Sequence, residues 1–108
     1  MMVVPATHVR EIRHPAADQI DLATVLRTVG DPVRLEIVRE LAGKDCHCGD
    51  ISLPVTKSTS THHFRVLRES GVIEQIPEGT ARINRLRRDD LEARFPGLLD
   101  SVLASAGD

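Results

Sequence analysis

Apolar residues recur at helical spacing in the first third of the chain. Between residues 16 and 29 they fall three or four positions apart, which predicts a helix that ends at Gly30. A second predicted helix is better marked, because Asp31 is a natural N-cap, Pro32 suits the first helical position and Gly43 is a stop signal. The pattern therefore predicts two consecutive helices before the first cysteine.

The next segments predict a short helix and then a long polar one. In "ISLPV", Pro54 limits any helix to one or two turns. A longer helix is predicted at about residues 57–70. Either Thr56 or Ser58 can cap this helix, and Gly71 ends it.

The pattern changes again after the long helix. At about residues 72–86, two short β-like runs are joined by "PEGT", whose proline and glycine are typical turn residues. Residues 89–105 return to helical spacing, and we expect Pro96 either to break that helix or to open a second one. The predicted order of helix, helix, short helix, long helix, β-hairpin and helix is typical of a mainly α, winged helix-turn-helix fold with a two-stranded β-hairpin wing.

Length and composition fit one soluble domain. The chain has 108 residues, of which 41% are hydrophobic and 28% are charged, enough for a single core. We expect residues 16–108 to form that domain and residues 1–15 to form a flexible N-terminal arm. No stretch approaches about 18 consecutive apolar residues, so no transmembrane helix is expected. The start of the chain lacks the pattern of a signal peptide, so we expect a cytoplasmic protein with reduced thiols.

Positive charge is concentrated in one stretch. Residues 57–88 carry 7 basic and 3 acidic groups, net +4. Residues 1–56 carry 6 basic and 8 acidic groups, net −2, and residues 89–108 carry 1 basic and 5 acidic groups, net −4. The basic stretch coincides with the predicted long helix and hairpin, so it is a candidate polyanion-binding surface. A helix fits the major groove of DNA, and an arginine-bearing hairpin can lie against phosphates or enter the minor groove.

Three segments resemble one protein family. "GDPVRLEIVREL", "KSTSTHHFRVLRESGVI" and "EGTARINRL" resemble the ArsR/SmtB family of bacterial repressors, with a match that covers roughly residues 22–88. The resemblance implies a homodimer, with helical dimerisation elements at both ends, that binds a two-fold operator in double-stranded DNA. It also implies that an inducer releases the protein from this operator. Many members of the family sense metal ions, and many others do not.

The chain departs from the family pattern at several points. "GDISLPV" lacks a residue or two of the usual short helix, and the wing lacks its common tyrosines. Ser60 stands where the family usually has a branched apolar residue. A frequent metal site of the family, on the last helix, uses Asp and His ligands. No histidine follows His63, so we expect that site to be absent.

The predicted DNA contacts lie on the polar face of the long helix and on the hairpin. Side chains of the helix face are expected at base edges, where Arg65 best suits guanine, and those of the helix start are expected at phosphates. The hairpin arginines are expected at phosphates or in the minor groove, with an ordinary solvated hairpin as the alternative. The predicted contacts are Thr59, Thr61, His62 and Arg65 to bases, Lys57 and Ser58 to phosphates, and Arg82 and Arg85 from the hairpin.

Other charged residues of the basic stretch have different expected roles. His63 shares the apolar face of the long helix, which favours a partly buried structural histidine over a base contact. Arg68 has two open roles, a phosphate contact or a contact with an acid of the protein itself. Arg87 and Arg88 are followed directly by two aspartates, so local ion pairing is their expected role.

The hexapeptide "DCHCGD" holds both cysteines, with His47 between Cys46 and Cys48. Its position resembles that of a Cys-x-Cys pair in several metal-sensing relatives. If the segment binds a metal, the thiolates of Cys46 and Cys48 are the expected ligands, but two thiolates are too few for a tetrahedral shell, and His47, His8 and His14 are the candidate nitrogen ligands. Soft sulfur with nitrogen suits zinc, nickel, copper or trivalent arsenic. The alternative is that Cys48 packs as a small buried residue and Cys46 is incidental.

No catalytic constellation stands out. The sequence contains neither a Gly-x-Ser-x-Gly nucleophile motif nor a Gly-rich phosphate loop, so we do not expect an enzyme. The leading hypothesis is a sequence-specific, dimeric, DNA-binding repressor that a metal ion or a thiol-reactive signal releases from its operator. The alternative is a winged-helix protein-interaction module within a regulatory complex, without a metal response of its own.

Overall fold

Capping aspartates set the start of the first two α-helices. In the computed structural model, which describes residues 12–107, the Asp21 side chain accepts a hydrogen bond from the Thr24 N–H at 2.9 Å. This cap starts α1, Leu22–Val29. Asp31 accepts hydrogen bonds from two N–H groups of the following turn and starts α2, Pro32–Gly43, as predicted.

The predicted start of the first helix at residue 16 was wrong. A 3-10 helix, Ala17–Gln19, and an extended Ile20 precede α1. Ile20 is only 1% exposed, so burial of a single extended residue accounts for an apolar position that had been counted as helical. A helix and a buried extended residue share this signal because periodicity over a few residues cannot separate them.

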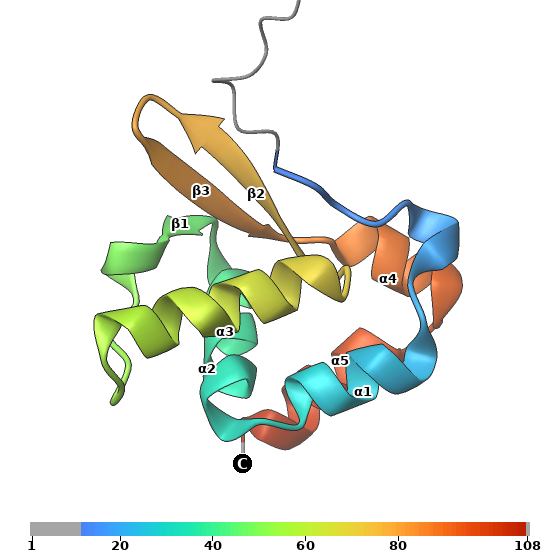
Figure 1. Ribbon diagram of the computed structural model, residues 1–108. Coiled ribbons are helices and arrows are strands. Elements are labelled where there is room, and N and C mark those ends of the chain that lie inside the picture. The colour runs from blue at the N-terminus through green and yellow to red at the C-terminus, as the bar shows by residue number, and fades with distance from the viewer. Residues whose placement is uncertain (1–11, 108) are drawn as a thin grey trace, which may run out of the picture.

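The segment after α2 forms no α-helix at "ISLPV", contrary to the prediction. Instead Cys46–His47 form a short strand, β1, and Cys48–Asp50 form a 3-10 helix. β1 pairs antiparallel with β3, Ala81–Leu86, which also pairs with β2, Ile73–Glu78. The predicted two-stranded wing is therefore part of a three-stranded sheet with the order β1-β3-β2 (Figure 1).

The predicted long helix is α3, Lys57–Glu69. The Thr56 hydroxyl caps it by accepting a hydrogen bond from the Thr59 N–H at 3.3 Å. Gly71 follows the helix with a φ of 86°. A Cβ atom at this position would lie 2.6 Å from the Ile20 side chain, so both the backbone conformation and the packing require glycine.

The C-terminal segment, predicted to be helical at residues 89–105 with a break or a second helix at Pro96, forms two helices. α4, Arg88–Arg94, is followed by α5, Leu98–Ala106. The break lies at Pro96, where one was expected, and Gly97 takes a left-handed conformation with a φ of 84° before α5 begins. None of the helices in residues 12–107 combines the length and the apolar character that crossing a membrane requires.

One hydrophobic core joins the helices to the sheet. Phe64 and Leu67 of α3 are 1% and 0% exposed, as their predicted apolar face requires. They belong to the same cluster as Ile37 and Val38 of α2 and Ile73 of β2. Figure 1 shows α3 lying below the sheet and beside α2. Burial of its apolar face fixes the orientation of α3 and turns its polar face away from the core.

Candidate nucleic-acid interface

The helix α3 presents a polar face and a polar N-terminal end to solvent. The six predicted contact residues of this helix are all exposed: Lys57, Ser58, Thr59, Thr61, His62 and Arg65. Arg65 Nη2 donates to His62 Nδ1 at 3.4 Å, so these two side chains lie together. Free N–H groups and the helix dipole make the first turn suitable for a phosphate. The helix therefore offers hydroxyl, imidazole and guanidinium groups in one accessible row.

His63, next to this row, is directed inward. It is 8% exposed, and its Nδ1 accepts a hydrogen bond from Arg34 Nη1 at 3.2 Å. The Nε atom of Arg34 also donates to the Thr28 carbonyl at 2.7 Å. His63 thus connects α3 to α1 and α2, and the prediction of a structural histidine is confirmed by its burial.

A groove of about 730 Å³ lies between α3 and the wing. Its lining includes Lys57, Arg65 and Arg68 from α3 and Arg82 from β3. Arg82 is exposed, and its side chain has no hydrogen bond or ion pair with any residue of the described part of the chain. Cations from two elements therefore border one groove, which is the arrangement expected of a surface that holds a nucleic-acid backbone.

The sequence left two roles open for Arg68, a phosphate contact or a contact within the protein. In the structure its contacts are within the protein. Its Nη1 donates to Gln75 Oε1 at 2.9 Å, and its Nη2 lies 3.9 Å from the Glu69 carboxylate. The side chain is 15% exposed. Nη1 and Nη2 are therefore engaged within the protein, while Nε is buried without a hydrogen-bond partner among the described residues.

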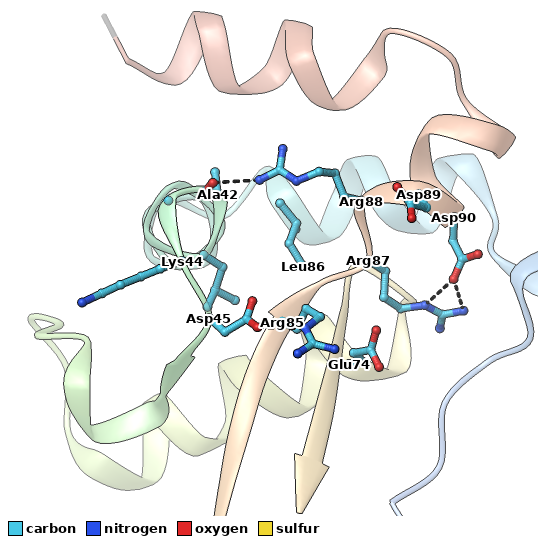
Figure 2. A pocket seen from close by; sticks show the side chains of 12 residues that line it. Ala42, Lys44, Asp45, Glu74, Arg85, Leu86, Arg87, Arg88, Asp89 and Asp90 are labelled. Atoms are coloured by element: carbon cyan, nitrogen blue, oxygen red, sulfur yellow. Dashed lines mark hydrogen bonds and ion pairs between the residues drawn. The ribbon is translucent and has the colours of Figure 1, made fainter.

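The other wing arginine, Arg85, has a partner within the chain. Its Nε donates to Asp45 Oδ2 at 2.9 Å, and this hydrogen bond raises the pKa of Arg85. Arg85 is opposite Glu74 in the register of the hairpin, on the side that lines a second cavity of about 570 Å³ (Figure 2). Strand alternation places Arg82 and Arg85 on opposite faces of β3. The predicted DNA contact of Arg85 stays a prediction, and the structure supplies a competing partner for this side chain.

Arg87 and Arg88 line the same second cavity and are also engaged (Figure 2). Arg87 donates to Asp90 Oδ2 from Nε and Nη2, at 3.1 and 2.9 Å, as its predicted ion pairing requires. Arg88 Nη2 instead donates to the Ala42 carbonyl at 2.7 Å, so the predicted ion pair of Arg88 was wrong. The last turn of α2 leaves carbonyl groups without helical partners, and a guanidinium can satisfy one of them.

The two cysteines lie in different surroundings. Cys46 is 6% exposed, its thiol donates to the Lys44 carbonyl at 3.4 Å, and burial raises the pKa of the Cys46 thiol. Cys48 is half-buried, and its sulfur accepts a hydrogen bond from Asn84 Nδ2 at 3.2 Å. The alternative to metal binding had assigned the buried position to Cys48, and the structure assigns it to Cys46.

The predicted nitrogen ligands have other contacts. His47 Nε2 donates to Glu78 Oε1 at 3.0 Å, and His14 Nε2 accepts from the Gln75 backbone N–H at 2.9 Å. His8 lies outside the described residues, as does most of the predicted N-terminal arm. Within residues 12–107, no three His, Cys, Asp or Glu side chains gather as a group that could hold a metal ion. Metal binding by Cys46 and Cys48 therefore stays a prediction.

Sequence reasoning did not identify two buried amides in the wing, Gln75 and Asn84. They are 4% and 0% exposed and face each other in the hairpin register. Strand alternation contained the signal, since each lies two residues from a buried apolar residue, Ile73 or Leu86, and so on the inward face of its strand. A polar residue at an inward position requires a hydrogen-bonding partner.

Comparison with known proteins places this sequence in a family. The sequence model of the bacterial regulatory protein family arsR matches residues 31–75, from the cap of α2 into β2. The HTH-type transcriptional regulator YceK of Bacillus subtilis (strain 168) is 32% identical over 89 residues, which cover 79% of this chain and 88% of YceK. The chain belongs to the ArsR family. This ArsR-family protein is accordingly a DNA-binding transcriptional regulator and not an enzyme.

Solved structures of ArsR-like regulators share the fold. The transcriptional repressor BigR from Xylella fastidiosa is 27% identical, with a TM-score of 0.62, over 78% of this chain and 84% of BigR. An ArsR-like transcriptional regulator from Rhodococcus sp. RHA1 is 26% identical, with a TM-score of 0.58, over 78% of this chain and 87% of that protein. The predicted winged helix-turn-helix fold of this ArsR-family protein is thereby confirmed.

Proposed function

We propose that this ArsR-family regulator is a homodimeric repressor that binds a two-fold operator and leaves it when an inducer binds. The observation that carries the proposal is the exposed polar face of α3 beside a groove with cations on both walls. In this proposal Thr59, Thr61, His62 and Arg65 contact base edges in the major groove. Lys57 and Ser58 hold a phosphate, and Arg82 of the wing contacts the backbone or the minor groove.

The face formed by α1 and α5 supports the dimeric part of the proposal. Leu22 and Leu26 of α1 are 44% and 45% exposed. The same side of the protein has half-buried apolar residues, Val29 of α1 and Leu98 and Val102 of α5, which line one small cavity of about 10 Å³. Contiguous apolar surface of this kind marks an interaction site, and a second copy would cover it. Dimeric helix-turn-helix proteins bind half-sites about 34–36 Å apart, so the dimer interface determines operator spacing.

Repression is the mode that the comparisons favour, since BigR is described as a transcriptional repressor. The predicted inducer is a metal ion or a thiol-reactive signal that acts at Cys46, His47 and Cys48. Because residues 12–107 assemble no metal-binding group alone, a metal site there requires ligands from residues 1–11, such as His8, or from a second copy. A Cys46→Ser/Cys48→Ser variant that keeps operator binding but loses release by zinc or arsenite would support this part.

The test of the proposal is binding to the DNA upstream of the protein's own gene. Fluorescence anisotropy should show tight binding with a steep fall in affinity as salt increases, because several phosphates are neutralised. Sedimentation should show a dimer at micromolar concentration, and a reporter should show lower transcription when the protein is present. Binding to this DNA no tighter than to random DNA, at any salt concentration, would instead favour the protein-interaction module.

A further inference from the structure

A continuous chain of polar side chains runs from α3 through the wing to β1. Arg68 Nη1 of α3 donates to Gln75 Oε1 of β2 at 2.9 Å. Gln75 Nε2 donates to Asn84 Oδ1 of β3 at 2.8 Å. Asn84 Nδ2 then donates to the Cys46 carbonyl at 3.1 Å and to Cys48 Sγ at 3.2 Å. This series of hydrogen bonds therefore joins α3, both strands of the wing and β1.

The direction of every link follows from Arg68. A guanidinium can only donate, so Gln75 must turn its oxygen toward Arg68 and its NH₂ group toward Asn84. Asn84 must then accept from Gln75 with its oxygen, which leaves its NH₂ group for the Cys46 carbonyl. Each link is thus satisfied in one arrangement only, and reversing either amide would place two donors or two acceptors against each other.

Burial makes this chain costly to break. Gln75 is 4% exposed and Asn84 is 0% exposed, so neither amide can exchange its partner for bulk water. The backbone N–H of Gln75 is also engaged, because it donates to His14 Nε2 at 2.9 Å on the outer edge of the sheet. Gln75 therefore connects to α3, to β3 and to the segment before α1.

The groove described above depends on the same two elements. Arg65 is on α3 and Arg82 is on β3, and both line the groove between helix and wing. The only side-chain hydrogen bond that the described residues show between α3 and β2 or β3 is the one from Arg68 to Gln75. Apolar packing holds α3 near the sheet, but directional bonds restrict sliding and rotation more than apolar contacts do.

We propose that Gln75 is a positioning residue for operator binding: through Arg68 and Asn84 it holds the wing at the separation from α3 that lets Arg65 and Arg82 reach one DNA site together. The inference rests on the proposed DNA contacts of these two arginines. Gln75 itself is buried and uncharged, so it acts on DNA binding through other residues and not by contact with DNA.

The test is a double-mutant cycle between Gln75→Met and Arg82→Ala, measured by anisotropy on the operator. Methionine keeps the length of the side chain and removes both hydrogen bonds of the Gln75 side-chain amide. If the wing is held in place, the Arg82 contact needs no further ordering, and Arg82→Ala weakens binding by its full amount, about three- to tenfold. In the Gln75→Met background the wing must be ordered on binding, so Arg82→Ala should weaken binding less than about twofold.

A second variant separates positioning from simple loss of stability. Gln75→Glu still accepts from Arg68 but places a carboxylate oxygen against Asn84 Oδ1, so it keeps the link to α3 and breaks the link to β3, and its affinity should lie between those of wild type and Gln75→Met. Gln75→Met alone should weaken operator binding by about tenfold and reduce the salt slope by up to about one unit, because the phosphate contact of Arg82 is then largely lost although the cation is still present. The matched control is Gln19→Leu, which removes a local bond to the Ala16 N–H far from the wing and should leave binding unchanged.

The outcomes distinguish this inference from the proposed function. If the wild-type protein does not prefer its operator, the proposed function fails. If it does prefer its operator, but Arg82→Ala has the same effect with glutamine or methionine at position 75, Gln75 is merely structural and the inference is overturned. If thermal unfolding shows that Gln75→Met is not folded, Arg68→Met removes the same hydrogen bond from the helix side. Its effect on operator binding must then be non-additive with that of Arg82→Ala in the same way.

Discussion

Two basic regions of this protein look alike in sequence and differ in the folded structure. On α3 and the outer part of the wing, Lys57, Arg65 and Arg82 are exposed and have no acidic partner among the described residues. At the base of the wing, Arg85 and Arg87 pair with aspartates and Arg88 bonds to a backbone carbonyl (Figure 2). The first region can release counterions from DNA, whereas the second is already occupied.

The comparison teaches that net charge does not measure a nucleic-acid surface. Residues 57–88 carry a net charge of +4, from 7 basic and 3 acidic groups. Several of those cations stabilise the joint between α2, β3 and α4 instead of facing a partner. The free cations lie along one groove, and only their number should enter the salt dependence of DNA binding.

Replacing Arg65 should have the largest effect on DNA binding. Arg65→Ala is expected to cost about 1–3 kcal/mol on the operator and to relax the preference for one base, since a bidentate contact to guanine is lost. Anisotropy on the operator and on single-base variants measures both effects. Wild-type affinity in this variant would show that α3 docks on DNA in another orientation.

Replacing Arg87 should affect folding and not DNA binding. Its side chain is 9% exposed and makes hydrogen bonds to Asp90 and to the Pro15 carbonyl, the latter at 2.8 Å. Arg87→Met should lower the free energy of unfolding by about 1–3 kcal/mol, because these part-buried charged bonds are lost. Urea denaturation measures this change, with the exposed Arg39→Met as control. A lower salt slope of DNA binding in Arg87→Met would contradict the division into two regions.

Arg82 and Arg85 form a matched pair on one strand. Arg82→Ala should weaken binding about equally on all sequences and reduce the salt slope by about one unit, because a phosphate contact is lost. Arg85→Ala should leave the slope unchanged, since Asp45 already holds its guanidinium at 2.9 Å. Titrations at several salt concentrations measure both slopes. An equal reduction in the two variants would show that Arg85 leaves Asp45 to contact DNA, as the sequence had suggested.

The smallest expected effect is a pH dependence at His14, which contacts the sheet beside the second region. Although His14 is largely exposed, its contact with the sheet partly desolvates the ring, which lowers the pKa of His14; Arg87 and Arg68 lower it further, while Glu74 acts in the other direction. The folded pKa thus lies below the unfolded value of about 6.5. The contribution of His14 to stability is complete above that value and is lost as pH falls through it toward the folded pKa.

This pH effect is measured by comparing wild type with His14→Gln. Glutamine can still accept from the Gln75 N–H but does not titrate in this range. The free energy of unfolding should therefore fall less in the variant than in wild type between about pH 7.5 and 5.5, a range that brackets the ordinary histidine pKa of about 6.5. His62→Gln is the control at an exposed position. Identical pH dependence in His14→Gln and wild type would exclude this role.

Local signals predicted much of the fold and of the site. Asp31, Pro32 and Thr56 mark helix starts because a capping side chain acts on N–H groups two or three residues away. The polar face of α3 followed from helical periodicity and contains all the helix residues that were expected to contact DNA. These features depend on neighbours within one or two turns, so the sequence displays them directly.

The failures concern contacts between distant segments. β1 was missed because two residues carry no strand pattern alone, and β1 exists through its pairing with β3. The first helix was predicted to start too early because the apolar Ile20 was counted in the helical pattern, whereas it is extended and packs against Gly71. The buried amides Gln75 and Asn84 were not identified because their partners are on three other elements.

The sequence by itself determined the helix boundaries marked by caps, the polar face of α3, the hairpin and membership in the ArsR family. Only the tertiary structure decided which arginines are free and which thiol is buried. The partners of Arg85 and Arg88 lie 40 and 46 residues away, at Asp45 and Ala42. Caps and periodicity act over neighbouring residues, whereas these pairings depend on how the packed core brings remote segments together. Charge along a chain therefore predicts where a polyanion surface can lie, and folding selects the cations that remain to form it.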